Sequence, residues 1–214
     1  RGRLRAGADQ RFRAGHPWVY SNELSESPKG REPGAPVELC DAGGQFLARG
    51  YGNPASLISF RSMSRDPKIE APTEPSHIRK QLLAAKQVRI AAGMGEASYR
   101  LCFGEADRLP GLGIDRYRVV QPTEATVFVI QAHTAGMNRI VDMLPLILEE
   151  LEAGAAIVVR NDVGVRKLEG LTEEEPRVLR EARGLDLTKP VTIVVYGGGK
   201  FTCDLLEGQK TGFF

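Results

Sequence analysis

The sequence has only three cysteines and three histidines among its 214 residues. Cys40, Cys102 and Cys203 form no C-x-x-C pair and no cluster with histidine, which argues against a zinc site and against a disulfide framework. Each cysteine lies in an apolar, strand-like run, where a thiol behaves as a small hydrophobic side chain. We therefore expect reduced, buried cysteines in a cytoplasmic protein.

Long apolar runs and a strong excess of charge are also missing. No run is long enough to cross a bilayer and no signal peptide is present, so we expect no membrane partner.

The net charge is +2, so composition alone does not require an anionic partner. The exception is the basic N-terminal arm, which contains five arginines and only one acid, Asp9. The arginines are Arg1, Arg3, Arg5, Arg11 and Arg13. Such an arm is attracted to a phosphate backbone, although a solvated tail is the plainer interpretation.

Prolines divide the chain into two parts. Residues 64–76, "SRDPKIEAPTEPS", carry three prolines and alternating charges, which is typical of a linker. Upstream, short alternating runs separated by turn signals predict a small β-barrel. Downstream, residues 76–93 predict a helix with Ser76 as its N-cap and Gly93 after its end.

Beyond this helix the pattern predicts an α+β layer with a mainly antiparallel sheet. A helix is expected over residues 136–154, and Pro145 should kink it or start a new segment. The alternation of a doubly wound nucleotide-binding sheet is not present. The strand candidates are residues 99–107, 111–121, 125–134, 155–162 and 191–206, the last being two strands joined by three glycines.

The motif "GQKTG", residues 208–212, is similar to the end of a phosphate-binding loop. The spacing fails, because Gln209 separates the glycine from the lysine and Cys203 occupies the position of the other glycine. We therefore do not expect an NTPase.

The motif "GEADRLPGLGID" places Glu105, Asp107 and Asp115 within eleven positions. Paired acids serve general acid–base chemistry or hold a metal. The alternative is a hairpin loop whose acids cap turn amides or pair with Arg108 and Arg116. No histidine lies nearby, so we favour the structural interpretation and keep a metal-dependent hydrolase as the less favoured one.

The motif "GHPWVYSNEL" combines aromatic side chains with the preceding arginines, as base-stacking surfaces do. Trp18 alternates with Val19, which favours a place in the barrel core, whereas His16 and the arginines are expected at the surface. His77 and His133 are isolated in the sequence, and we expect structural roles for both.

Four stretches in this order resemble a known family: "GHPWVYSNEL", "LCFGEADRLPGLGIDRY", "VRKLEGL" and "KFTCDLLEGQKTGFF". The family is that of bacterial and archaeal S-adenosylmethionine-dependent RNA methyltransferases, which includes the large-subunit ribosomal RNA cytosine-C5 methyltransferase. The resemblance implies a mixed fold with four parts. They are a PUA-type RNA-binding barrel at 1–66, a linker and connecting helix at 67–98, an EEHEE α+β domain at 99–200, and the start of a methyltransferase domain at 201–214.

The resemblance also implies that this chain is cut at both ends, since it starts at Arg1 and stops within a motif. The C-terminal Rossmann-like methyltransferase domain is then expected to be absent, and the fragment to be inactive alone. No catalytic residue is expected here, because the three cysteines match none of the family's catalytic positions, whose thiolate attacks C6 of the base.

The resemblance places cofactor contacts at the end of the chain and RNA contacts along its first half. The residues expected to border the S-adenosylmethionine pocket, as a half-site, are Lys210, Thr211, Gly212, Phe213 and Phe214. Those expected to position RNA phosphates are Arg11, Arg13, His16, Arg49, Arg65, Arg79 and Lys86. Two departures from the family pattern are Arg108, where glycine is usual, and Gly197–Gly199, where Glu-Asn-Gly is usual.

We therefore interpret the sequence as the RNA-recognition part of a ribosomal RNA methyltransferase. The alternative is a stand-alone, non-catalytic RNA-binding or ribosome-assembly module. Related enzymes often pair, so a homodimer is possible.

Overall fold

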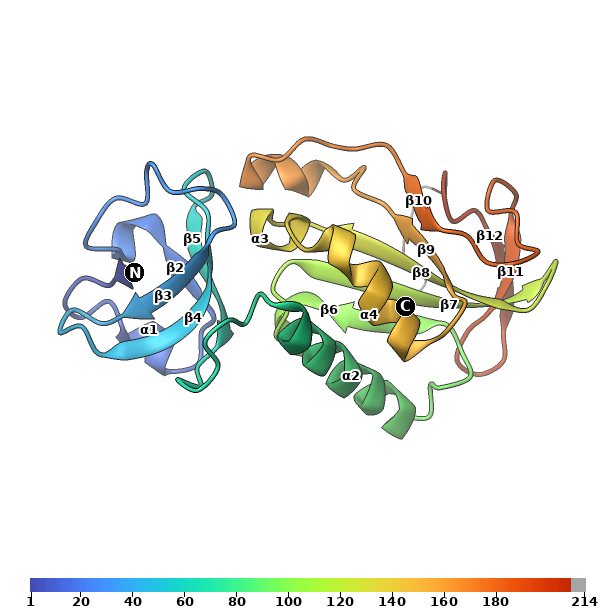
Figure 1. Cartoon of the computed structure of the whole chain (residues 1–214), viewed down its shortest axis with the longest axis horizontal. Coiled ribbons are helices and arrows are strands. Elements are labelled where there is room, and N and C mark those ends of the chain that lie inside the picture. Colours follow the sequence, from blue (N-terminus) through green and yellow to red (C-terminus); the bar gives the residue numbers. More distant parts are fainter. Residues whose placement is uncertain (209–214) are drawn as a thin grey trace.

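The computed structural model describes residues 1–208 and contains two β-sheets joined by a linker (Figure 1). The strands of the first sheet are β1 (Gly2–Arg3), β2 (Trp18–Tyr20), β3 (Pro36–Cys40), β4 (Phe46–Gly52) and β5 (Ile58–Ser64). Their order is β1-β3-β4-β5-β2, and only the β1–β3 pair is parallel. Two short helices, α1 (Gln10–Arg13) and η1 (Ser21–Glu23), complete this part. The short strands predicted upstream of the linker are therefore present.

The first sheet curves around its own apolar core, which includes Leu4, Phe12, Val19, Leu39 and Phe60. Glycine is needed at Gly50, where an added Cβ would lie 1.9 Å from the carbonyl oxygen of Arg61. Since the register of β4 and β5 shifts at this point, the missing side chain lets the two backbones approach closely.

The second sheet has seven strands and is mixed. They are β6 (Tyr99–Phe103), β7 (Leu112–Gln121), β8 (Ala125–Ala132), β9 (Ala156–Val159), β10 (Arg177–Arg180), β11 (Val191–Val194) and β12 (Lys200–Cys203). The order is β10-β9-β8-β7-β11-β12, and β6 pairs with the first half of β7. The β8–β9 pair is parallel and the others are antiparallel.

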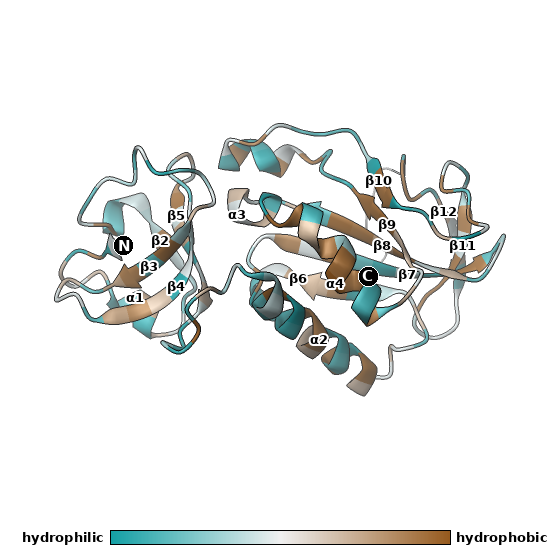
Figure 2. Ribbon diagram, viewed as in Figure 1, coloured by the Kyte–Doolittle hydropathy of each residue, from teal (hydrophilic) through white to brown (hydrophobic). Residues whose placement is uncertain are grey.

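Both faces of the second sheet are buried. Its helices are α2 (Pro75–Ala91), α3 (Ala135–Asn138) and α4 (Leu144–Leu151), with the shorter η2 (Gly104–Asp107), η3 (Val141–Met143) and η4 (Gly164–Glu169). Along β8, Phe128 and Ile130 join the core under α2 and α4, whereas Val127 and Val129 join a second core on the opposite face. This is the period of two expected of a strand covered on both sides, and β8 and β9 are mostly hydrophobic in Figure 2.

The predicted helices are present with shifted boundaries. Helix α2 begins at Pro75 after the N-cap Glu74, not after Ser76, and Gly93 follows its end with a φ of +79°. Val88, near the end of this helix, is exposed. Pro145 lies in the first turn of α4, so it starts a new helix as one alternative predicted.

The predicted fold class needs correction. We expected a barrel followed by an EEHEE layer, and the second part instead has seven strands. Its sheet is mainly antiparallel, as expected, but it contains one parallel pair. The strand β10 was missed because "RVLR" is short, charged and largely exposed, so it carries no apolar alternation. The parallel β8–β9 pair arises because α3 and α4 carry the chain back between the two strands.

None of the helices within residues 1–208 is both long enough and apolar enough to span a membrane.

Candidate nucleic-acid interface

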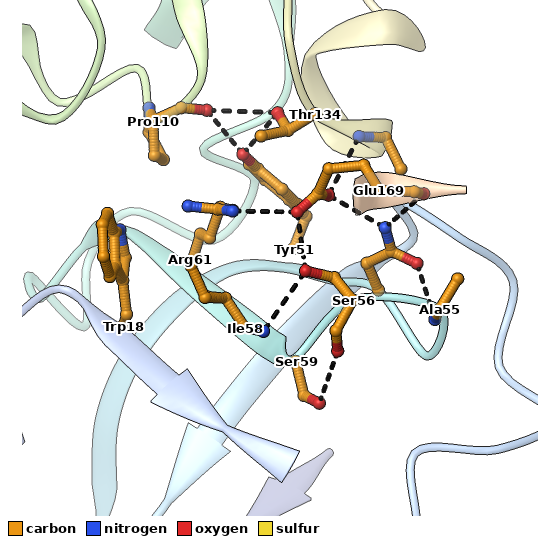
Figure 3. A network of polar contacts seen from close by, with 12 residues as sticks. Trp18, Tyr51, Ala55, Ser56, Ile58, Ser59, Arg61, Pro110, Thr134 and Glu169 are labelled. Atoms are coloured by element: carbon orange, nitrogen blue, oxygen red, sulfur yellow. Dashed lines mark hydrogen bonds and ion pairs between the residues drawn. The ribbon is translucent and has the colours of Figure 1, made fainter. Parts of the chain in front are cut away.

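The two sheets are held together by a buried polar cluster, which we call the junction cluster (Figure 3). At its centre Glu169, at the end of η4, is only 4% exposed. Its carboxylate accepts hydrogen bonds from Asn53 Nδ2 at 2.9 Å, from Ser56 Oγ at 2.7 Å and from Arg61 Nη2 at 2.8 Å. The cluster consists of Tyr51, Asn53, Ser56, Arg61, Thr134 and Glu169. A buried carboxylate is tolerated here because a guanidinium and two neutral donors satisfy it.

Tyr51 extends the junction cluster into the second sheet. Its hydroxyl donates to the carbonyl oxygen of Pro110 at 2.5 Å and lies 2.8 Å from Thr134 Oγ1. Burial raises the pKa of Tyr51, so this side chain remains a neutral donor. Gly136 lies flat against the ring, where an added Cβ would come within 2.3 Å of the aromatic carbons. The contact therefore requires glycine.

Trp18 lies at the junction between the two sheets and not, as predicted, in the barrel core. Its Nε1 donates to Glu105 Oε1 at 2.8 Å, and the guanidinium of Arg61 lies 5.2 Å from its ring centroid. Glu105 is thus held by Trp18 and by Arg61, whose Nη1 is 3.4 Å away. These bonds fix η2 against the first sheet. Glu105 also lines a cavity at this junction.

The cavity lies between the end of β5, the linker, α2 and η2, and its volume is about 520 Å³. We call it the basic cavity. Its lining includes Arg65 and Asp66 from the linker side, His77, Lys80 and Gln81 from α2, and Glu105 and Arg108 from η2 and its end.

Three cations of the basic cavity are exposed and form no ion pair within residues 1–208: Arg65, Lys80 and Arg108. Arg65 is anchored by a hydrogen bond to the carbonyl oxygen of His16 and stacks 4.2 Å from the ring of Phe12. Burial lowers the pKa of His77, and the charges of Lys80 and Arg108 lower it further. These three cations outnumber the two acids of the lining, Asp66 and Glu105, of which Glu105 is already paired with Arg61. This balance of charge favours anionic ligands such as phosphate groups.

Among the predicted RNA contacts, four arginines are engaged by acids. Arg11 binds Glu23, Arg13 binds Asp9 and Asp41, Arg49 binds Glu38, and Arg79 binds Glu150. Such pairs leave less net charge for an external phosphate.

The other three predicted contacts lie in different surroundings. Arg65 alone lines the basic cavity. His16 lies beside Arg11 and contacts the edge of Trp18, and Lys86 donates to the carbonyl oxygen of Leu151. No comparison tests these seven assignments, so they stay predictions.

Lys80 was not among the predicted contacts, and His77 was expected to have only a structural role. One indication was present in the sequence for Arg108, which stands where glycine is usual in the resembling family. In the structure this residue has a left-handed φ of 61°, a conformation that glycine adopts easily. For Lys80 no signal was available, because its role depends on the linker folding back along α2.

The acids of "GEADRLPGLGID" each bind a guanidinium. Asp107 pairs with Arg89 at 2.5 Å and Asp115 with Arg100 at 2.7 Å, while Glu105 is held as described above. The partners differ from the predicted Arg108 and Arg116, but the structural interpretation of these acids is supported. Over the described part of the chain, no three His, Cys, Asp or Glu residues are grouped to hold a metal ion.

The residues predicted to border the cofactor pocket, Lys210, Thr211, Gly212, Phe213 and Phe214, lie outside the described residues.

Comparison with known proteins agrees with this geometry. Residues 3–65 match the family of PUA-like domains. The chain is also similar to proteins named ribosomal RNA large subunit methyltransferase I. That of Aliivibrio fischeri (strain MJ11) is 35% identical over 214 residues, and that of Erwinia tasmaniensis is 32% identical over 215 residues. In both cases the match covers 99% of this chain and 50% of the relative, so the chain spans about half the length of the curated relatives.

Two solved structures share the fold. A Streptococcus mutans protein assigned as a SAM-dependent methyltransferase aligns with a TM-score of 0.69 at 16% identity. A second structure, assigned as a methyltransferase complexed with SAH, aligns with a TM-score of 0.70 at 16% identity. Each alignment covers 99% of this chain and 50% of the other.

These alignments complete the correction of the fold class. Almost the whole chain, and not a PUA-type barrel alone, follows the fold of methyltransferase structures. The predicted division of the chain into domains at residues 66, 98 and 200 is not tested by these alignments and stays a prediction.

Proposed function

We propose that this chain is the RNA-binding region of an S-adenosylmethionine-dependent methyltransferase that acts on ribosomal RNA, and that the whole protein methylates C5 of a cytosine. The observation that carries the proposal is the basic cavity. It adjoins the end of the PUA-like domain, and its three cations have no acidic partner within residues 1–208. Similarity to proteins named ribosomal RNA large subunit methyltransferase I supports ribosomal RNA as the proposed substrate. A cytoplasmic location belongs to the same proposal.

In this proposal the basic cavity holds the RNA backbone and the junction cluster sets its geometry. Arg65, Lys80 and Arg108 approach from three different segments, so they contact phosphates only while the first sheet keeps its place against η2. Contacts to phosphates fix the register of an RNA without reading its sequence. The buried Arg61–Glu169 pair supplies the rigidity that such positioning requires.

S-adenosylmethionine would supply the methyl group in the whole protein. The residues proposed to border it, Lys210 to Phe214, lie outside the described residues. Among the described residues, Cys102 is fully buried and burial raises its pKa, which argues against a role as nucleophile.

The test compares large-subunit ribosomal RNA from cells with and without the gene, by nuclease digestion and mass spectrometry. The proposal predicts that one 5-methylcytosine is lost and is restored by the wild-type gene. A gene encoding Arg65→Ala, Lys80→Ala and Arg108→Ala together should restore it poorly, whereas one encoding Lys189→Ala, which removes an exposed lysine outside the cavity, should restore it fully. Unchanged methylation in the deletion strain would contradict the proposal, and loss of a methyl group from another base would contradict its cytosine part.

A further inference from the structure

A second, smaller hollow adjoins the basic cavity and shares Glu105 with it. Its volume is about 220 Å³. Pockets for whole small ligands usually enclose about 300–1,000 Å³, so this hollow suits a single flat ring system. Its lining consists of Arg100, Phe103, Gly104, Glu105, Ala106, Gly111, Leu112, Gly113, Gln131 and His133.

The hollow exists because a glycine lies between two larger residues on one face of the sheet. Gly113 on β7 is paired directly with Phe103 on β6 and with Gln131 on β8. Directly opposed residues of antiparallel strands project to the same face, so the missing side chain leaves a slot between the other two. The position of a Cβ on Gly113 would be 3.8 Å from Gln131 Oε1 and 3.8 Å from His133 Cε1.

One wall of the slot is an exposed aromatic ring. Phe103 is 61% exposed although it ends a strand whose neighbours Leu101 and Cys102 are fully buried. The guanidinium of Arg100 lies 5.5 Å from the ring centroid and is itself fixed by two hydrogen bonds to Asp115. An exposed, oriented ring beside a fixed guanidinium is a platform on which nucleobases stack.

The opposite wall carries polar groups without a partner. Gln131 is only 7% exposed, it lines the hollow, and its side-chain amide forms no hydrogen bond within residues 1–208. The amide atoms are not sealed from solvent, since Arg61 Nε is the one fully buried side-chain polar atom without a partner in this part of the chain. The amide is therefore free to bond a ligand that enters the hollow, with two donors and one acceptor oxygen. His133 is likewise without a side-chain hydrogen bond in this part of the chain. Its pKa is lowered by burial and by the charges of Arg100 and Arg166, so at neutral pH it offers one donor and one acceptor.

We propose that this slot binds one unstacked base of single-stranded RNA. The base stacks on Phe103, its polar edge faces Gln131 and His133, and the adjoining phosphates lie toward Arg108 and the basic cavity. Only an unstacked base offers a free face and a free edge at once, which excludes a base within a duplex. The inference rests on the proposed function, since it takes RNA to be the ligand of the adjoining cavity.

The test measures binding of two single-stranded octamers of equal charge by fluorescence anisotropy, one of uridine and one of abasic ribose phosphate. For the uridine octamer, Phe103→Ala should weaken binding about 5- to 150-fold, the range found for a lost base–aromatic stack. Phe103→Tyr should restore it. For the abasic octamer, Phe103→Ala should have no effect. The control is Phe201→Ala, which removes another half-exposed phenylalanine, on β12, and should leave both affinities unchanged.

A second variant tests the polar wall. Gln131→Met keeps the length of the side chain and removes its amide, so it should narrow the spread of affinities among the adenine, cytosine, guanine and uracil octamers. An equal spread in wild type and variant would overturn the assignment of Gln131.

Two further outcomes separate the inference from the proposed function. If the wild type binds RNA in a salt-dependent way and Phe103→Ala does not change the affinity, the base slot is overturned and the proposed function stands. Phe103 would then belong to a protein contact surface. If the wild type binds neither octamer nor ribosomal RNA at low salt, the proposed function is overturned together with the slot.

Discussion

The carboxylate of Glu169 lies 2.8 Å from the guanidinium of Arg61, although 108 positions separate the two residues in the sequence. Both side chains are buried, and the pair joins the first sheet to the end of η4. The same guanidinium also contacts Glu105 and Trp18, which connects the junction cluster to the wall of the basic cavity. The geometry of the candidate site therefore depends on a bond between two residues that do not themselves line the basic cavity.

Glu169→Ala should destabilise the protein strongly. It leaves the buried Arg61 without its closest carboxylate, and removing one partner of a buried ion pair costs about 3–5 kcal/mol. Chemical denaturation measures the free energy of unfolding. The matched control is Glu173→Ala, which breaks an exposed pair with Lys167 and should change stability little. Equal, small effects of both variants would show that the junction cluster does not hold the two sheets together.

Gly136→Ala should also destabilise the protein, by about 1–3 kcal/mol, because the new methyl group overlaps the ring of Tyr51. Gly95→Ala is the control, since a Cβ there would lie at an ordinary contact distance of 3.7 Å from Ile90. Thermal unfolding of the two variants distinguishes them. A Gly136→Ala protein as stable as the wild type would mean that Tyr51 is not packed as described.

Acidification should reduce stability before the carboxylates titrate. The pKa values of His77 and His133 are lowered in the folded protein, and both groups have an ordinary value of 6.5 when unfolded. Below pH 6.5 the unfolded chain therefore binds more protons than the folded one, and the free energy of unfolding falls as the pH falls toward the folded pKa values.

The measurement is the free energy of unfolding at pH 7.5 and at pH 5.5, for the wild type and for a His77→Gln, His133→Gln double variant. The wild type should lose more stability between the two values than the double variant does. An equal loss in both proteins would show that neither imidazole is shielded from protonation.

Local pattern predicted the elements of this protein better than their assembly. The helix ending before Gly93 and the hairpin around Gly197–Gly199 follow from glycine conformation and apolar periodicity, and both are present. Trp18 was misplaced because alternation with Val19 is a strand signal, whereas its partner Glu105 comes from the other sheet. The same limit explains why Lys80 was not among the predicted contacts. Only the folded chain shows that Arg79 pairs with Glu150 and that Lys80 lines the basic cavity together with His77 and Arg108.

The central claim is that the basic cavity binds the RNA backbone, and the salt dependence of binding tests it most directly. Each cation that neutralises a phosphate of single-stranded RNA contributes about 0.7 to the slope of log affinity against log salt concentration. Arg65→Ala, Lys80→Ala and Arg108→Ala together should weaken binding and make the slope shallower by about 2, whereas Lys189→Ala should leave it unchanged. A wild-type affinity that does not respond to salt, or a triple variant with the slope of the wild type, would contradict the account.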